Sequence, residues 1–233
     1  MSNNTLADTF AIHVQDVKRI YQSAAEPVVA LKGVNLAVAP GQFVALKGRS
    51  GSGKTTLLNC IGGLDRPTEG VILVNGRALH NMDDQALTLW RQQEVGFIFQ
   101  NFGLLPTLSA FENVELMLRI ARFPRRQRKD QAMHYLAQVG LSKWAEHRPY
   151  EMSGGQQQRV AIARALANQP KIILADEATG ELDFETAHEI LQLFRTVARE
   201  NSITILLASH DNLVAEYVDQ VLNLQDGQIV ESD

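Results

Sequence analysis

The chain has 233 residues, of which 45% are hydrophobic, so it can bury a sizeable core as one large domain or as one domain with an inserted lobe. Its 22 lysines and arginines against 26 aspartates and glutamates give a net charge of −4, which does not predict a whole-surface attraction to nucleic acid or anionic lipid. The single cysteine, Cys60, excludes an internal disulfide framework and a cysteine-built zinc site, and fits a reducing compartment.

The first forty residues show the alternation of β-strands. Apolar and polar side chains alternate with a period of two in FAIHVQDVKRIY, residues 10–21, and in LKGVNLAV, residues 31–38. We expect these segments to form an antiparallel sheet against the rest of the molecule.

A glycine-rich loop comes next. FVALKG, residues 43–48, is a short apolar run typical of a strand buried on both faces. It leads into GRSGSGKTT, residues 48–56, which matches G-x-x-x-x-G-K-[ST] and precedes a predicted helix from Thr55 to Gly62. The alternative is a glycine and serine turn that happens to precede a lysine.

The chemistry of this loop is phosphate binding. Bare backbone N–H groups and the positive end of a helix bind phosphate oxygens, so Lys54 would reach the β- and γ-phosphates and the Thr55 hydroxyl would ligate Mg²⁺. The loop therefore predicts a bound nucleoside triphosphate. The expected contacts are Gly48, Arg49, Ser50, Gly51, Ser52, Gly53, Lys54, Thr55 and Thr56.

Three further apolar runs each end at a polar residue. VGFIF, residues 95–99, ends at Gln100; KIILA, residues 171–175, ends at Asp176 and Glu177; ITILLAS, residues 203–209, ends at His210. In open α/β sheets ligands lie beyond the carboxyl ends of the strands, so we expect one shared site there.

The two acids complete the predicted chemistry. Asp176 would hold Mg²⁺ through water, and Glu177 would orient and deprotonate an attacking water. The alternative is a pair of solvated acids at a strand end.

The segment from about Phe102 to Met152 is charged and rich in helical patterns, as in AFENVELMLRIA and DQAMHYLAQVG, so we expect a helical lobe inserted into the core. Its stretch FGLLPTLSAF, residues 102–111, is interpreted either as a core loop or as a partner site. Its basic cluster is either a solvated helix face or a contact with anionic lipid headgroups. The cluster consists of Arg122, Arg125, Arg126, Arg128 and Lys129.

The rest of the chain contains two amphipathic helical patterns, Gln156 to Asn168 and Glu185 to Arg199. An Asp-Gly turn in the tail QVLNLQDGQIVES, residues 220–232, predicts a closing hairpin.

MSGGQQQRVAIARAL, from Met152, resembles the signature of ABC-type ATPases. The resemblance implies that the helix N-terminus carrying Ser153, Gly154, Gly155 and Gln156 faces the γ-phosphate bound by a second copy, again because N–H groups and a helix dipole attract an anion. It therefore implies a head-to-tail homodimer that encloses two ATP molecules.

Other motifs follow in the order of that family. The resemblance implies that Tyr21 stacks on adenine, although an ordinary sheet tyrosine is the alternative. It implies that Gln100 links Mg²⁺ and the water to the helical lobe, and that His210 contacts the γ-phosphate, with a structural histidine as the alternative. Asp183 matches the loop that crosses the dimer interface.

The resemblance covers nearly the whole chain and implies its fold class: an α/β P-loop NTPase (RecA-like) core with a mostly parallel sheet, an N-terminal antiparallel β-subdomain and an inserted helical subdomain. We expect one ABC ATPase domain over residues 1–233. The core with the β-subdomain would take about 1–101 and 154–233, and the helical subdomain about 102–153.

IGGLDRPTEG, NFGLLPTLSAFENVEL and SGGQQQRVAIARAL are similar to the ATPases of lipoprotein-release and macrolide-efflux transporters. Three residues depart from that branch: Ala178 stands where proline is usual, Met152 where leucine is usual, and Glu181 where asparagine or a small residue is common.

The resemblance implies a cytoplasmic subunit on the inner face of the cell membrane that powers a permease docked near Gln100–Glu115, and no nucleic-acid partner. An alternative is the ATPase of an envelope complex that transmits force without moving a substrate. A member acting on ribosomes or DNA fits less well, because such relatives carry two cassettes or a long coiled coil.

Overall fold

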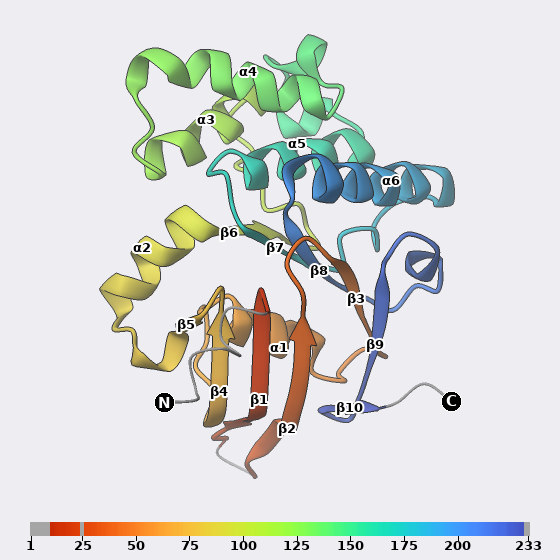
Figure 1. Ribbon diagram of the computed structural model, residues 1–233. Coiled ribbons are helices and arrows are strands. Elements are labelled where there is room, and N and C mark those ends of the chain that lie inside the picture. The colour runs from red at the N-terminus through yellow and green to blue at the C-terminus, as the bar shows by residue number, and fades with distance from the viewer. Residues whose placement is uncertain (1–9, 24–25, 231–233) are drawn as a thin grey trace.

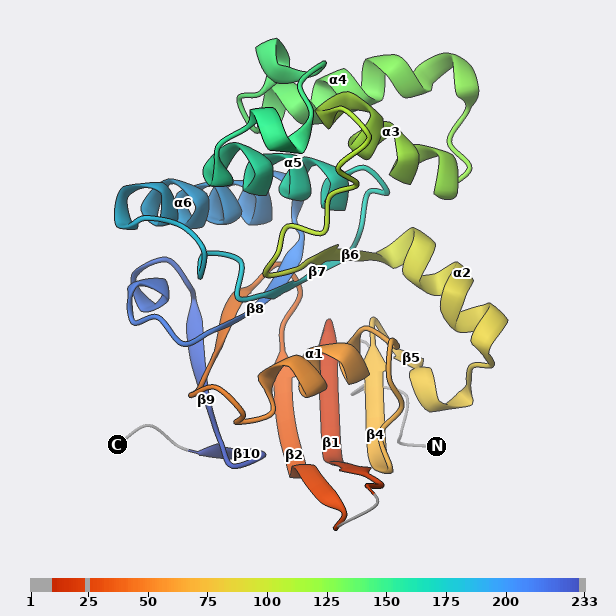
Figure 2. The same ribbon diagram turned by 180° about the vertical axis from the view of Figure 1, so that it is seen from behind.

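The computed structural model describes residues 10–23 and 26–230 and shows two sheets with a helical lobe at one end (Figure 1). Helices α5 and α6 cover one face of the larger sheet, and α1 lies between the two sheets (Figure 2). The expected fold class is confirmed: an α/β core, an N-terminal antiparallel sheet and an inserted group of helices. Within the described residues no helix is long and apolar enough to cross a membrane.

The larger sheet has six strands among the described residues and is parallel except at one edge. The apolar runs predicted as buried strands are its centre, because strands covered on both faces need apolar side chains on both sides. In spatial order the strands are β10 (Gln228–Val230), β9 (Gln220–Gln225), β3 (Phe43–Lys47), β8 (Thr204–Ser209), β7 (Ile172–Asp176) and β6 (Val95–Ile98).

The predicted hairpin of the tail is β9 and β10, joined at Asp226 and Gly227, which both have positive φ. The last two residues assigned to that hairpin, Glu231 and Ser232, lie outside the described residues.

The smaller sheet is antiparallel, as expected from the period-two pattern, and contains two strands that the pattern did not predict. Its order is β2 (Val28–Val38), β1 (Ile12–Tyr21), β4 (Glu69–Val74) and β5 (Arg77–Ala78). The strand β4 was missed because it joins the sheet through β1, which is distant in the sequence, and β5 was missed because two residues are too few for a period-two pattern.

The predicted helices exist with slightly shifted ends, and one helix was missed. The segments predicted from Thr55, Gln156 and Glu185 are α1 (Lys54–Ile61), α5 (Gly154–Leu166) and α6 (Phe184–Asn201). The missed helix is α2 (Asp84–Glu94), which Asp83 caps by accepting a hydrogen bond from the Ala86 N–H. The region expected as a helical lobe contains α3 (Ala110–Ile120) and α4 (Arg128–Gln138). Short 3₁₀ turns are Leu79–Asn81, Arg125–Gln127, Ser142–Trp144, Pro149–Glu151 and Leu213–Glu216.

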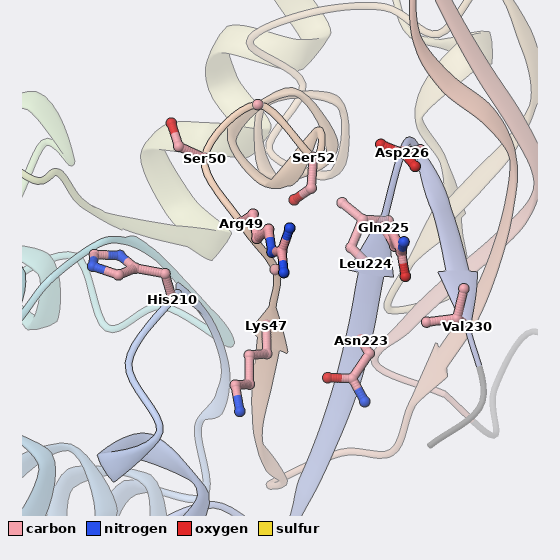
Figure 3. Close-up of a pocket in the computed structure, with 12 residues that line it drawn as sticks. Lys47, Arg49, Ser50, Ser52, His210, Asn223, Leu224, Gln225, Asp226 and Val230 are labelled. Carbon is pink, nitrogen blue, oxygen red and sulfur yellow. The ribbon is translucent and has the colours of Figure 1, made fainter. Parts of the chain in front are cut away.

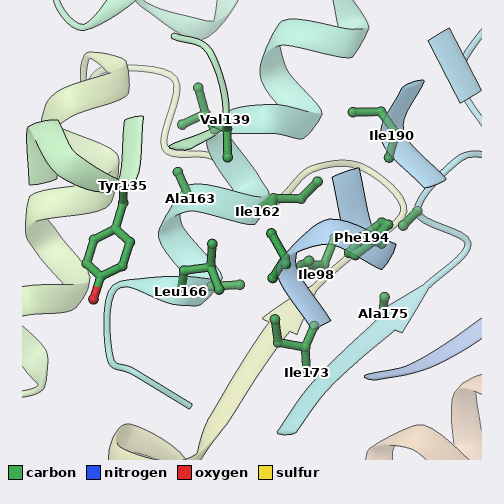
Figure 4. Close-up of a cluster of buried hydrophobic side chains, with 14 of the residues drawn as sticks. Ile98, Tyr135, Val139, Ile162, Ala163, Leu166, Ile173, Ala175, Ile190 and Phe194 are labelled. Carbon is green, nitrogen blue, oxygen red and sulfur yellow. The ribbon is translucent and has the colours of Figure 1, made fainter. Parts of the chain in front are cut away.

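The helical lobe and the large sheet share one apolar core. Figure 4 shows side chains of α5, β6 and β7 interdigitating, with Ile162, Ile98 and Ile173 near the middle. Each such buried side chain contributes about 1.5–3 kcal/mol of transfer free energy. This continuous packing fixes the start of α5 relative to the carboxyl ends of the strands.

Candidate active site

The glycine loop joins β3 to α1 and leaves room for a ligand on two sides. On one side is a cleft of about 390 Å³ that also receives residues of β2 and residues that follow β6, β7 and β8. Its lining is Val28, Val29, Ala30, Ser50, Gly51, Gly53, Lys54, Thr55, Thr56, Gln100, Glu177 and His210. On the other side a cleft of about 730 Å³ lies between the loop and the β9–β10 hairpin (Figure 3).

The smaller cleft contains Lys54, Thr55 and Glu177, which the sequence predicts to act on phosphate, Mg²⁺ and water. The larger one is lined by the outer side of the loop together with Lys47, Asn223 and Gln225, and it lacks Lys54, Thr55 and Glu177 among its lining residues.

The loop needs glycine at Gly53 for two reasons. Its φ of 105° is unfavourable for a residue with a side chain, and a Cβ there would lie 2.7 Å from the carbonyl oxygen of Ala30. Gly53 therefore lets β2 approach the start of α1 and leaves the loop backbone bare.

Lys54 is the first residue of α1 and is almost completely buried. Its ammonium donates to the carbonyl oxygens of Gly48 at 2.8 Å and Arg49 at 3.2 Å, and lies 3.2 Å from Glu177 Oε1. Backbone carbonyl oxygens of the glycine loop therefore hold the Lys54 ammonium in place.

Glu177 directly follows β7 at the carboxyl end of that strand. Its N–H donates a hydrogen bond to the carbonyl oxygen of Ala208 at 2.9 Å. Its φ is +49°, which costs a residue with a side chain roughly 1–3 kcal/mol, so the sheet holds it in a strained conformation of the kind found at functional sites. Its Oε2 lies 2.7 Å from Nδ1 of His210, the residue after β8. Three neighbouring strands thus bring Lys54, Glu177 and His210 together.

Asp176, the last residue of β7, has a carboxylate oxygen suited to a metal ion. Burial raises the pKa of Asp176, the neighbouring Glu177 charge raises it further, and a hydrogen bond with Thr55 opposes the rise. Its Oδ1 is buried and has no hydrogen-bond partner among the described residues. A buried oxygen without a donor beside a threonine hydroxyl fits a hard cation such as Mg²⁺.

Gln100 lies two residues after β6, on the exposed rim of the cleft. Its amide donates to Glu181 Oε1 at 3.4 Å. Glu181 is one of the three residues that depart from the efflux and lipoprotein-release pattern. Its carboxylate therefore accepts a hydrogen bond from the glutamine that is predicted to link Mg²⁺ to the helical lobe.

Tyr21 ends β1, and its cross-strand partner Val28 lines the smaller cleft. The Tyr21 hydroxyl donates to Asp65 at 2.7 Å, and the Arg19 guanidinium lies 4.3 Å from the ring centroid. Tyr21 itself is not among the lining residues of the cleft, and Asp65 holds its hydroxyl.

The signature residues lie apart from both clefts among the described residues. Ser153 caps α5, and its hydroxyl accepts a hydrogen bond from the Gln156 N–H, while the Gln156 side chain accepts one from the Ser153 N–H. Asp183 caps α6 by accepting hydrogen bonds from the N–H and hydroxyl of Thr186.

These two helix starts lie side by side. A Cβ on Gly154 would be 3.3 Å from Leu182, and a Cβ on Gly155 would overlap Cγ2 of Thr186. The Ser153 and Asp183 regions therefore form one surface, which lines neither cleft of its own chain.

Arg164 on α5 is a connection that the sequence patterns did not indicate. Its guanidinium donates to the carbonyl oxygen of Phe102 at 2.9 Å and to that of Gly103, and burial lowers its pKa. It therefore ties the segment after Gln100 to the signature helix. A helical arginine in an alanine-rich stretch carries no local signal of this contact.

Comparison with known proteins shows which family this chain belongs to. Residues 31–180 match the family described as ABC transporter. The chain belongs to the ABC transporter family.

Its relatives in the ABC transporter family include the lipoprotein-releasing system ATP-binding protein LolD of Geobacter metallireducens, 42% identical over 219 residues, which are 94% of this chain and 97% of the relative. The macrolide export ATP-binding/permease protein MacB of Syntrophobacter fumaroxidans is 42% identical over 94% of this chain but only 31% of its own length. A solved dimeric structure, the post-hydrolysis state of the ATP-binding cassette MJ0796 bound to ADP and Pi, has a TM-score of 0.88 and 42% identity, covering 95% of this chain and 97% of that one. MJ0796 is an uncharacterized ABC transporter ATP-binding protein of Methanocaldococcus jannaschii.

The expected assignment to the ATP-binding subunits of ABC transporters is thereby confirmed, and the chain is an ABC-type ATPase.

Proposed function

We propose that this chain hydrolyses ATP as the nucleotide-binding subunit of a membrane transport complex of the lipoprotein-release or efflux type. The observation that supports it most is the meeting of Lys54, at the start of α1 after the glycine loop, with Glu177 and His210, the residues that follow β7 and β8. Such a site has a phosphate-binding cation, a base for water and a second polar group within hydrogen-bond reach of the base.

The proposed roles follow from these positions. Residues 48–56 hold the phosphates, Lys54 neutralises the transferring phosphoryl group, and Glu177 accepts a proton from the attacking water while His210 orients Glu177 and contacts the γ-phosphate. Tyr21 stacks on the adenine. Thr55, Asp176 and Gln100 would hold Mg²⁺, which neutralises charge on the phosphates when bound.

We place the second half of each site on a second copy of the chain. Ser153–Gln156 and Asp183 line neither cleft of their own chain, yet the N-terminus of α5 is the positive end of a helix dipole, which attracts an anion. Two copies related by a two-fold axis would each supply this surface to the other's γ-phosphate. The dimeric structure of the MJ0796 cassette with ADP and Pi supports this proposal.

A permease would dock in an apolar groove of about 360 Å³ that lies beside the segment after Gln100. Phe99 and Leu105 line it and are 43% and 45% exposed. Arg164 joins this segment to α5, so closure of the ATP site would move the groove together with the signature helix. We place the subunit on the cytoplasmic side of the membrane through this contact.

We also propose that residues 1–233 form one ABC ATPase domain, with the helical subdomain at about 102–153 between the parts of the core.

The test is capture of the tagged chain from solubilised membranes with its native partner, followed by ATPase and transport measurements on the complex. We expect one integral membrane protein to co-purify and to be lost from Leu105→Asp, while the matched exposed variant Leu89→Asp retains it. Purification without any membrane protein would contradict the proposal. A complex that hydrolyses ATP but moves no substrate would favour the force-transmitting alternative.

A further inference from the structure

The turn between α3 and α4 carries an unusual concentration of positive charge. Within residues 122–129 there are five cations and no acid. One of them, Arg128, is partly buried and donates to the carbonyl oxygen of Phe123 at 2.8 Å. The other four, Arg122, Arg125, Arg126 and Lys129, are exposed, and their side chains carry no ion pair or hydrogen bond to any residue that the structure describes. We call residues 122–129 the basic turn.

Elsewhere on the described surface many exposed cations are paired. Arg66 lies 3.0 Å from Asp84, Arg77 lies 2.8 Å from Glu94, and Arg119 lies 2.5 Å from Glu115. A merely solvated helix face would be expected to mix both signs in this way. The basic turn instead gathers unpaired positive charge in a protein whose net charge is −4.

The basic turn lies at the end of the helix that lines the proposed permease groove. Asn113, Leu116 and Met117 on α3 face that groove, and the next residue at helical spacing, Ile120, is 38% exposed. The chain then enters the basic turn. In Figures 1 and 2 this connection and α2, whose end forms the opposite wall of the groove, lie along the same edge of the molecule.

The position of the basic turn beside the proposed permease groove determines whether it faces the membrane. A permease seated in the groove is embedded in the bilayer, so the edge that carries the groove faces the membrane. We propose that the basic turn contacts the anionic headgroups of phospholipids beside the permease. The proposal rests on the proposed function, since only a permease in the groove brings this edge to a bilayer.

The chemistry of the turn suits a phospholipid surface. Guanidinium groups form bidentate hydrogen bonds to phosphate oxygens, and three of the four exposed cations are arginines. Each cation near an anionic leaflet raises affinity roughly five-fold, and clusters of this size are the usual size of lipid-binding basic segments. Long side chains from one short turn can reach several headgroups without needing a shaped pocket.

The experiment is co-sedimentation of the purified full chain with vesicles of phosphatidylglycerol and phosphatidylcholine, compared with phosphatidylcholine alone. We expect binding only to the anionic vesicles, weakening as NaCl rises. The triple variant Arg125→Ala, Arg126→Ala, Lys129→Ala is expected to bind about a hundred-fold more weakly. The matched control, Lys143→Ala, Arg195→Ala, Arg199→Ala, removes the same charge from other parts of the surface and is expected to bind like the wild type.

Three results would overturn the proposal: no preference for anionic vesicles, equal losses in the two triple variants, or vesicle binding that the first variant leaves intact. The same variant is also tested in the capture from solubilised membranes. If it still bound anionic vesicles but no longer captured the permease, the partner of the basic turn would be an acidic segment of the permease, and the proposal would be overturned. Melting temperatures check that both variants fold. The vesicle assay contains neither permease nor hydrolysis, so its failure leaves the proposed function to be judged separately.

Discussion

The ammonium of Lys54 lies 3.2 Å from Oε1 of Glu177, so the cation proposed to hold phosphate and the carboxylate proposed to activate water form one ion pair. The side chains are 6% and 15% exposed, which places the pair in a medium where its interaction is stronger than at the surface. A phosphate group arriving at the loop would compete with Glu177 for the same lysine. Phosphate binding and release of the base are therefore linked in this site.

We predict that Glu177→Gln binds ATP but hydrolyses it at least a hundred-fold more slowly, because the proton acceptor is lost while the loop that holds phosphate is unchanged. The variant should also accumulate as an ATP-bound dimer. Phosphate release and light scattering with ATP and Mg²⁺ measure the two effects. Glu185→Gln, an exposed residue in the first turn of α6, is the control and should behave like the wild type. Near-normal turnover in Glu177→Gln would refute the role of Glu177.

We predict that Lys54→Ala abolishes detectable nucleotide binding, since it removes the single buried lysine or arginine among the described residues that line the smaller cleft. Titration with a fluorescent ATP analogue measures this directly. Lys47→Ala, which removes a cation from the larger cleft, should bind the analogue with little change. Unchanged affinity in Lys54→Ala, or a loss confined to Lys47→Ala, would place the phosphates in the other cleft.

We predict that two inactive variants restore activity when they are mixed. Ser153→Arg blocks the signature surface and Lys54→Ala disables the glycine loop, but a mixed dimer contains one site with an intact loop and an intact partner surface. Random pairing should return roughly a quarter of wild-type turnover. Each variant alone provides the control. A mixture no more active than its components would show that the site is completed within one chain.

We predict that Gly155→Ala lowers the free energy of unfolding by about 1–3 kcal/mol, because the new methyl group overlaps Cγ2 of Thr186 and α5 cannot approach α6 as closely. Thr186→Ser removes that methyl group while keeping the hydroxyl that donates to Asp183. The double variant should therefore recover most of the loss, as measured by denaturant unfolding. Simple additivity of the two single effects would mean that this contact is not the cause.

We predict a pH-dependent loss of stability in Asp65→Asn. Burial alone would raise the pKa of Asp65, but hydrogen bonds from the Tyr21 hydroxyl, the Arg66 N–H and Arg19 outweigh it and hold the pKa below its usual value of 3.8. Because the pKa of Asp65 is lower in the folded state than in the unfolded state, its ionised carboxylate stabilises the fold at pH values above the unfolded-state pKa. This stabilisation is lost as the pH falls through the folded-state pKa.

The expected cost of Asp65→Asn is about 1–2 kcal/mol at pH 7, shrinking towards zero below pH 3.8. Thermal melts across this range measure it. Asp84→Asn, at the exposed end of the Arg66 pair, is the control and should change stability by less than about 0.5 kcal/mol at any pH. A constant difference for Asp65→Asn at all pH values would contradict the role of its charge.

The amino-acid sequence alone was sufficient for the strands of the large sheet, the glycine loop and the signature. Each of these is a local pattern: a buried strand needs consecutive apolar residues, and a backbone that wraps phosphate needs closely spaced glycines. Glu177 and His210 follow predicted strands and Lys54 ends the predicted glycine loop, so their convergence was predictable in outline.

Tertiary structure decided which groups meet. The order β3, β8, β7 places His210 and Glu177 beside Lys54, and no local pattern specifies that order. The contacts of Tyr21 with Asp65, Gln100 with Glu181 and Arg164 with the carbonyl oxygen of Phe102 join residues 44, 81 and 62 positions apart.

The helix α2 and the strands β4 and β5 escaped prediction for the same reason. The strand β4 depends on pairing with the distant β1, the two-residue β5 depends in turn on β4, and α2 is held by Leu87 and Trp90 in a core assembled from distant segments. Local periodicity reports what one segment buries, whereas the partners of a segment depend on the packing of the whole chain.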